Sequence, residues 1–285
     1  MTYGEAVTFV DSATRLGRLG VLLELRGGVS APVLAAAMAA PSDRPILVGA
    51  AAHGGRLDLV IPATHDTAVA VGLGDGASDA TAFRIRLDGA QTSVALARAG
   101  AISPRAAVDE IAAGAPAATI AAWFDLVDQL CAIAGGAIAG RSRGATGGGS
   151  IAVRYPVRDA QAEIYLIAAV DQLAAGLGSS AAQRRLWQRI HPQLGAGREV
   201  TVESQLVADR VSQRLVVGYP VTDWATAIRL AEGLVLDPSE AAEIPKRLGA
   251  VAGALDSDKL ESLEIELGPH EPPEVVVWAK LAPTG

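Results

Sequence analysis

The chain has 285 residues, and 50% of them are hydrophobic, which is ample for the buried core of a globular protein. Its formal net charge of −7 at pH 7 argues against a nucleic-acid-binding protein, because binding to phosphates depends on lysine and arginine. No apolar run reaches the length of a membrane span without glycine, proline or charge, and the first residues lack the apolar segment of a signal peptide. We therefore expect a single domain over residues 1–285, located in the cytoplasm, with neither nucleic acid nor membrane as a partner.

Helix-like and strand-like patterns alternate along the first half of the chain. Apolar residues with helical spacing predict helices over residues 30–40, 65–74 and 116–134. Strand-like runs come in pairs separated by turn residues, over residues 44–52 with 56–63 and over 81–87 with 92–100. Strands joined by such short turns form antiparallel pairs.

The second half repeats these parts. Strand-like runs cover residues 151–157, 198–207, 212–221, 259–267 and 273–281, and helix-like runs cover 158–178, 180–195, 222–234 and 237–255. Asp237 followed by Pro238 predicts the start of the last helix. Between the two halves, residues 140–150 (GRSRGATGGGS) are rich in glycine and predict a flexible loop.

The pentapeptide Tyr-Pro-Val-Xaa-Asp occurs at residues 155–159 and again at 219–223, each time between a strand-like and a helix-like run. Proline ends the hydrogen bonding of a strand and aspartate begins a helix, so the motif predicts a strand-to-helix corner used twice. Other matched positions have an offset similar to that between the two copies of the pentapeptide. Leu215 and Val276, for example, lie 61 residues apart. Against chance similarity among alanine-rich and leucine-rich helices, this pattern favours a repeated unit of about sixty residues.

A unit with the order helix, strand, strand, helix fits nearly five times into the chain. Antiparallel strands repeated in this way are expected to close into a barrel, because closure removes unpaired strand edges. We therefore predict an α+β fold, in which an antiparallel β-barrel of about ten strands, built from α-β-β-α units, is surrounded by helices. A barrel of this size encloses a ligand chamber rather than a plugged core.

Residues 54–74 (GGRLDLVIPATHDTAVAVGLG) resemble the second-strand pattern of the ABBA-type soluble bacterial aromatic prenyltransferases. Residues 212–221 and 259–281 are similar to the fourth and fifth strand pairs of that family. The resemblance implies a PT barrel, and transfer of a prenyl group from a prenyl diphosphate to a small aromatic acceptor in secondary metabolism. It implies no obligatory cofactor, with Mg²⁺ accompanying the diphosphate as the candidate metal.

The resemblance also implies three site residues. Arg214 matches an arginine that binds the diphosphate, and Lys280 lies near the lysine of the family's last strand. Asp58 matches a strand aspartate that faces the chamber, where a carboxylate can orient the acceptor or act as a base.

Further candidates follow from strand alternation. Arg84 and Arg86 share one face of a strand, either as an anion clamp in the lumen or as a solvated outer face with ion pairs to helices. Arg154 is a candidate only if the strand positions that face the lumen include Lys280. Tyr219 and Trp278 lie in strand runs and are candidates for the aromatic surface that stabilises an allylic cation. The four histidines have no metal-site spacing, so we predict no metal ligands in the chain.

Two alternatives remain open. The strand over 92–100 has no clear equivalent of the family's lysine, and only 4% of the residues are aromatic. These departures favour an enzyme that has lost the diphosphate site and catalyses cyclisation or pericyclic closure of a natural-product intermediate. A non-catalytic carrier of a hydrophobic metabolite is the third hypothesis. The charge of the lumen separates these hypotheses: inward cations favour the transferase, a neutral or acidic lumen the cyclase, and an apolar lumen the carrier.

Overall fold

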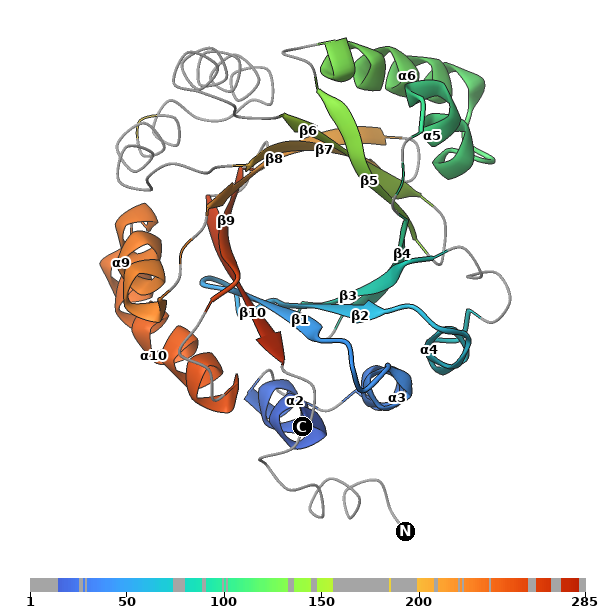
Figure 1. Ribbon diagram of the computed structural model, residues 1–285. Coiled ribbons are helices and arrows are strands. Elements are labelled where there is room, and N and C mark those ends of the chain that lie inside the picture. Colours follow the sequence, from blue (N-terminus) through green and yellow to red (C-terminus); the bar gives the residue numbers. More distant parts are fainter. Residues whose placement is uncertain are drawn as a thin grey trace.

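Ten antiparallel strands close into a barrel, and the helices lie around its outside (Figure 1). The computed structural model describes residues 15–25, 28, 30–73, 80–88, 91–98, 100, 102–132, 136–144, 148–155, 185, 199–207, 210–219, 221, 223–235, 237–255, 260–267 and 273–281. Each strand is hydrogen-bonded to its neighbours in the sequence, and β1 pairs with β10 to complete the ring. The predicted α+β fold with an antiparallel barrel of about ten strands is confirmed.

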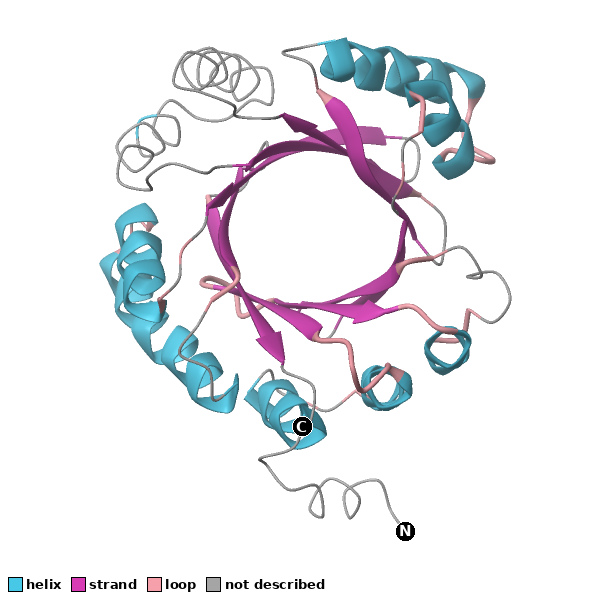
Figure 2. Ribbon diagram, in the orientation of Figure 1, coloured by secondary structure: helices cyan, strands magenta, loops and turns pink. Residues whose placement is uncertain are grey.

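The strands form five hairpins. They are β1 (Ile46–Ala51), β2 (Leu57–Pro62), β3 (Ala82–Asp88), β4 (Gln91–Arg98), β5 (Ala137–Gly144), β6 (Gly149–Tyr155), β7 (Glu199–Val207), β8 (Arg210–Tyr219), β9 (Ser262–Leu267) and β10 (Glu274–Leu281). The sequence predicts both strands of four of these hairpins, but only β6 of the hairpin that β5 and β6 form. The described helices lie outside the barrel (Figure 2).

The helices cover the outer face of the sheet (Figure 2). Those described are α2 (Arg15–Leu25), α3 (Ala31–Ala39), α4 (His65–Ala70), α5 (Pro104–Ile111), α6 (Ala117–Ala132), α9 (Trp224–Leu234) and α10 (Pro238–Leu255). The Asp223 side chain accepts a hydrogen bond from Thr226 N at 2.8 Å and so caps α9, as the second pentapeptide predicts. None of the described helices is long and apolar enough to cross a membrane.

The glycine-rich segment 140–150 is not the loop that the sequence predicts. Most of it belongs to β5 and β6, and Ser142 pairs with Ser150 in the ladder between them. Their hydroxyl groups share a hydrogen bond of 2.7 Å. Ladder bonds to neighbouring strands outweigh the low strand propensity of glycine here.

The main hydrophobic core lies between the barrel and the helices. Trp123 of α6 is fully buried, and its Nε1 donates a hydrogen bond of 2.8 Å to Ser204 Oγ of β7. Tyr155 of β6 likewise donates its hydroxyl proton to the carbonyl oxygen of Leu130, at 2.8 Å. Burying these large side chains against the strands fixes the helices on the barrel wall.

The helices predicted over 158–178 and 180–195 lie outside the described residues, apart from Arg185. The first pentapeptide is described only at Tyr155, where β6 ends. The single-domain interpretation over residues 1–285 stays a prediction.

Candidate active site

Charged side chains line the inner face of the barrel. In the strand register Asp58 of β2 lies opposite Arg86 of β3, and Glu203 of β7 lies opposite Arg214 of β8. Because alternate residues of a strand point to opposite sides, these residues share the face that the helices do not cover. The sheet thereby brings arginines and acids from both halves of the chain into one lumen.

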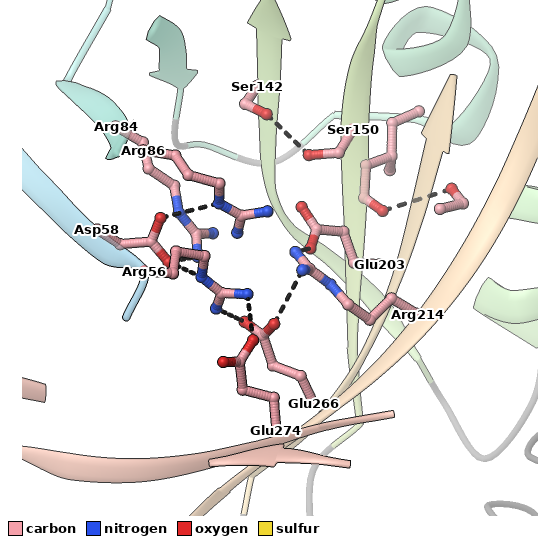
Figure 3. A network of polar contacts seen from close by, with 12 residues as sticks. Arg56, Asp58, Arg84, Arg86, Ser142, Ser150, Glu203, Arg214, Glu266 and Glu274 are labelled. Atoms are coloured by element: carbon pink, nitrogen blue, oxygen red, sulfur yellow. Dashed lines mark hydrogen bonds and ion pairs between the residues drawn. The ribbon is translucent and has the colours of Figure 1, made fainter. Parts of the chain in front are cut away.

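Eight of these residues form one connected network, which we call the ionic layer (Figure 3). Its members are four arginines and four acids: Arg56, Arg84, Arg86, Arg214, Asp58, Glu203, Glu266 and Glu274. With four cations and four anions, the formal charge of the layer is zero.

Asp58 is the centre of one half of the layer. Its carboxylate is fully buried and lies 2.9 Å from Arg86 Nε, 3.2 Å from Arg56 Nε and 3.5 Å from Arg84. Burial alone would raise the pKa of Asp58, but the three guanidinium groups outweigh it and hold this pKa below its ordinary value. An aspartate in this state holds arginines in position and is a weak base.

Arg214 is the centre of the other half. Its guanidinium group contacts Glu203 at 2.5 Å and Glu266 at 2.9 Å. Glu266 also contacts Arg56 at 2.9 Å and so joins the two halves. Burial opposes the charge of Glu203, but Arg214 and Arg84 lower its pKa well below the usual range. Arg214 is therefore fixed between two carboxylates.

An apolar wall stands beside the ionic layer. Trp278 of β10 lies on the inner face with Ala51 and Val276, and the Arg84 guanidinium carbon is 5.7 Å from the centre of its ring. A Cβ atom at Gly49 would lie 2.9 Å from ring atoms of Trp278. The glycine in β1 therefore makes the room that the indole occupies.

Two cavities lie along this lumen. The larger, of about 760 Å³, is lined by Arg84, Arg86, Arg214 and Glu203 together with serine and threonine side chains such as Ser93. Three arginines against one glutamate leave the described charged lining with a net charge of +2.

The smaller cavity, of about 260 Å³, has the opposite sign. Its charged lining is Arg84 and Arg154 against Glu203, Glu264 and Glu266, a net charge of −1. Arg84 and Glu203 line both cavities and so mark their common border. By these formal charges, the larger cavity is the better suited of the two to an anion.

Two acids of the lumen keep their protons more readily than usual. Burial raises the pKa of Glu264, an effect that the Trp278 indole and Arg84 oppose. Burial likewise raises the pKa of Glu274 to about 7, although Arg56 lies 2.8 Å away. Glu264 lines the smaller cavity and can exchange a proton there.

The structure brings most of the predicted residues together. Arg84, Arg86 and Arg214 line the larger cavity, so the first two form the inward pair rather than a solvated outer face. Arg154 lines the smaller cavity, and Trp278 belongs to the apolar wall.

Three predicted residues differ from their expected places or roles. Tyr219 packs in the hydrophobic core outside the barrel with Leu215 and Val217, because it has the odd-numbered parity of β8, and it does not line the chamber. Lys280 has the inward parity, but it is half-exposed and contacts Glu261 at 2.6 Å. Asp58 faces the lumen as expected, yet its paired state argues against the role of a base.

Sequence reasoning found Asp58 but missed Arg56 and the glutamates of the lumen, which are Glu203, Glu264, Glu266 and Glu274. Glu264 and Glu266 alternate with apolar residues in β9, and in β7 Glu203 has the opposite parity to Val200, Val202 and Leu206. This pattern is the signal of a charged inner face. Among the described residues, no group of three or more histidine, cysteine or acidic residues could hold a metal ion.

Solved structures with the same arrangement were found by comparison of folds. 5-Dimethylallyltryptophan synthase from Streptomyces coelicolor is 14% identical, with a TM-score of 0.51 over 94% of this chain and 97% of its own. The prenyltransferase PriB, in its ternary complex with L-tryptophan and dimethylallyl thiolodiphosphate, is 12% identical, with a TM-score of 0.52 over 93% and 94%. This chain has the PT-barrel fold. The apo form of PriB also shares the PT barrel, at 13% identity and a TM-score of 0.50. No family model matches the sequence, and no curated protein matches it.

Proposed function

We propose that the protein is an aromatic prenyltransferase, which transfers a prenyl group from a prenyl diphosphate to a small aromatic acceptor in secondary metabolism. The observation that carries this proposal is the larger cavity, where Arg84, Arg86 and Arg214 converge against one described acid, Glu203. Guanidinium groups match the oxygens of a diphosphate in charge and in hydrogen-bond geometry.

The arginines would stabilise the negative charge that develops on the diphosphate when the carbon–oxygen bond breaks. The apolar wall around Trp278 excludes water from the allylic cation, and the indole face stabilises positive charge. The aromatic acceptor then forms the new bond to the allylic carbon and loses a proton. Glu264, whose pKa is raised in the smaller cavity, is better suited than Asp58 to take this proton.

The comparisons support this reading, because structures that share the fold are a dimethylallyltryptophan synthase and a prenyltransferase in complex with a thiolodiphosphate. The described residues offer no metal cluster, so a Mg²⁺ ion would arrive with the diphosphate. A cytoplasmic location stays a prediction.

The cyclase is the second candidate, because the ionic layer as a whole carries no net charge. A neutral intermediate could bind without disturbing the equal numbers of positive and negative charges in the layer. The shape of the chamber and a few hydrogen bonds would suffice to hold this intermediate in the conformation that cyclises. The carrier is disfavoured, since eight charged residues converge in the lumen.

Calorimetric titration with geranyl thiolodiphosphate, with and without Mg²⁺, tests the proposal. We expect micromolar binding by the unchanged protein and loss of at least about tenfold in affinity for Arg214→Ala, because a charge-assisted contact is removed. Arg86→Ala is a second variant, which leaves Asp58 two guanidinium partners. Arg105→Ala is the control, because Arg105 is exposed and pairs with Asp109.

No binding by the unchanged protein under either condition would overturn the proposal. The cyclase would then be the leading function, and neutral polycyclic ligands would be the next probes. Equal loss of affinity in Arg105→Ala would show that the effect does not come from the cavity.

A further inference from the structure

We propose that Glu203 is a specificity-determining residue, a carboxylate built into the arginine-lined cavity that limits its affinity for anionic head groups. This inference rests on the proposed function, because it concerns the same cavity. It predicts an unusual result, namely that neutralising an ion-paired residue of the site improves the binding of an anion.

Glu203 lies inside the arginine-lined cavity. Glu203 is the single acid among the described residues that line the larger cavity, and it also lines the smaller one. Its side chain is 14% exposed, and its carboxylate contacts Arg214 at 2.5 Å. A diphosphate that reached Arg214 in this cavity would meet the negative charge of Glu203 beside it.

Glu203 also lowers the positive charge of this cavity. The lining has three arginines and one glutamate, so a neutral side chain at position 203 would raise its net charge from +2 to +3. Arg214 and Arg84 keep Glu203 ionised at neutral pH, so this charge is present whenever a ligand arrives. In a partly buried site a unit charge several ångströms away changes anion affinity by roughly tenfold or more.

Arg214 and Arg84 have other partners that hold them in place. Glu266 contacts Arg214 through the other terminal nitrogen, at 2.9 Å. Arg84 lies 3.5 Å from Asp58 and over the Trp278 ring. Without the charge of Glu203 the guanidinium groups therefore stay in position. The N–H groups that Glu203 engages then become available to a ligand. Glu203 is thus not required to position them, and its effect on an anion is repulsive.

The test compares Glu203→Gln with the unchanged protein in calorimetric titrations of inorganic pyrophosphate and of geranyl thiolodiphosphate. We expect the dissociation constant for both probes to fall by roughly tenfold or more in the variant, with a steeper dependence on salt concentration. Glu110→Gln is the matched control, because Glu110 of α5 pairs with Arg141 of β5 and lines neither cavity. The affinity of this variant for both probes should equal that of the unchanged protein. A loosened structure would weaken binding, so a gain separates the proposed role from a structural one.

The outcomes separate this inference from the proposed function. Binding by the unchanged protein with equal or weaker binding by Glu203→Gln overturns the inference and leaves the function. Binding by the variant alone supports the inference and overturns the transferase for the natural site. No binding by either protein overturns both. If Glu203→Gln does not fold, Glu203→Met is the second neutral variant, and an affinity no higher than that of the unchanged protein overturns the inference.

Discussion

The inner and outer faces of the same strands have opposite chemistry. On β8, Leu215, Val217 and Tyr219 face the helices and are almost completely buried, whereas Arg214 and Gly218 alternate with them toward the lumen. The outer face buries apolar surface, which is the main favourable contribution to folding. The inner face buries charges, whose desolvation costs about as much as their pairing returns. The fold is therefore stabilised from outside the barrel, whereas the lumen is shaped for a ligand.

The largest effect is expected from the outer face. Trp123→Ala removes a fully buried indole and its hydrogen bond to Ser204, so the free energy of unfolding should fall by about 4 kcal/mol. Urea unfolding measures this loss, and the folded fraction should bind thiolodiphosphate as before. Ser204→Ala, which removes only the hydrogen-bond acceptor, should lose about 1 kcal/mol. A loss in Trp123→Ala no larger than that in Ser204→Ala would contradict the assignment of stability to the outer face.

On the inner face, Asp58→Asn should lower the free energy of unfolding by about 3 kcal/mol at pH 7, because three guanidinium groups lose their buried partner. The folded-state pKa of Asp58 is lowered, so its contribution is present above the ordinary value of about 3.9 and is lost as pH falls through the folded-state value. The difference between the variant and the unchanged protein should therefore shrink below about pH 4. Urea unfolding at pH 7 and pH 3 checks this, and a difference independent of pH would show that charge is not its cause.

The smallest effect is expected at the rim of the barrel. Lys280→Ala removes an exposed ion pair with Glu261, so the free energy of unfolding should change by less than about 1 kcal/mol. Lys280 lines neither cavity, so the affinity for thiolodiphosphate should change less than about threefold. A tenfold loss in calorimetry would instead place this lysine at the diphosphate, as the resemblance implies.

The sequence alone determined the barrel and part of its lining. Alternation within one strand placed Arg84 and Arg86 on a common face, and the repeated strand-to-helix corner indicated the α-β-β-α unit. Both are local patterns, because the two-residue period of a strand and the chemistry of a turn depend on neighbouring residues. The same local reasoning misjudged 140–150, where strand pairing overrides the propensity of glycine.

Only the tertiary structure decided which charges meet. Asp58 of β2 contacts Arg56, directly before that strand, and Arg86 of β3. Arg56 in turn reaches Glu266 of β9 across the closed sheet, and Arg214 joins Glu203 of β7 to the same acid. Arg56 and Glu266 are more than 200 residues apart in the sequence. Their distance depends on the closure of the barrel and on the register of all ten strands, which no local pattern contains. The sequence could therefore predict a charged lumen, while the balance of its charges and the place of Glu203 came from the closed ring.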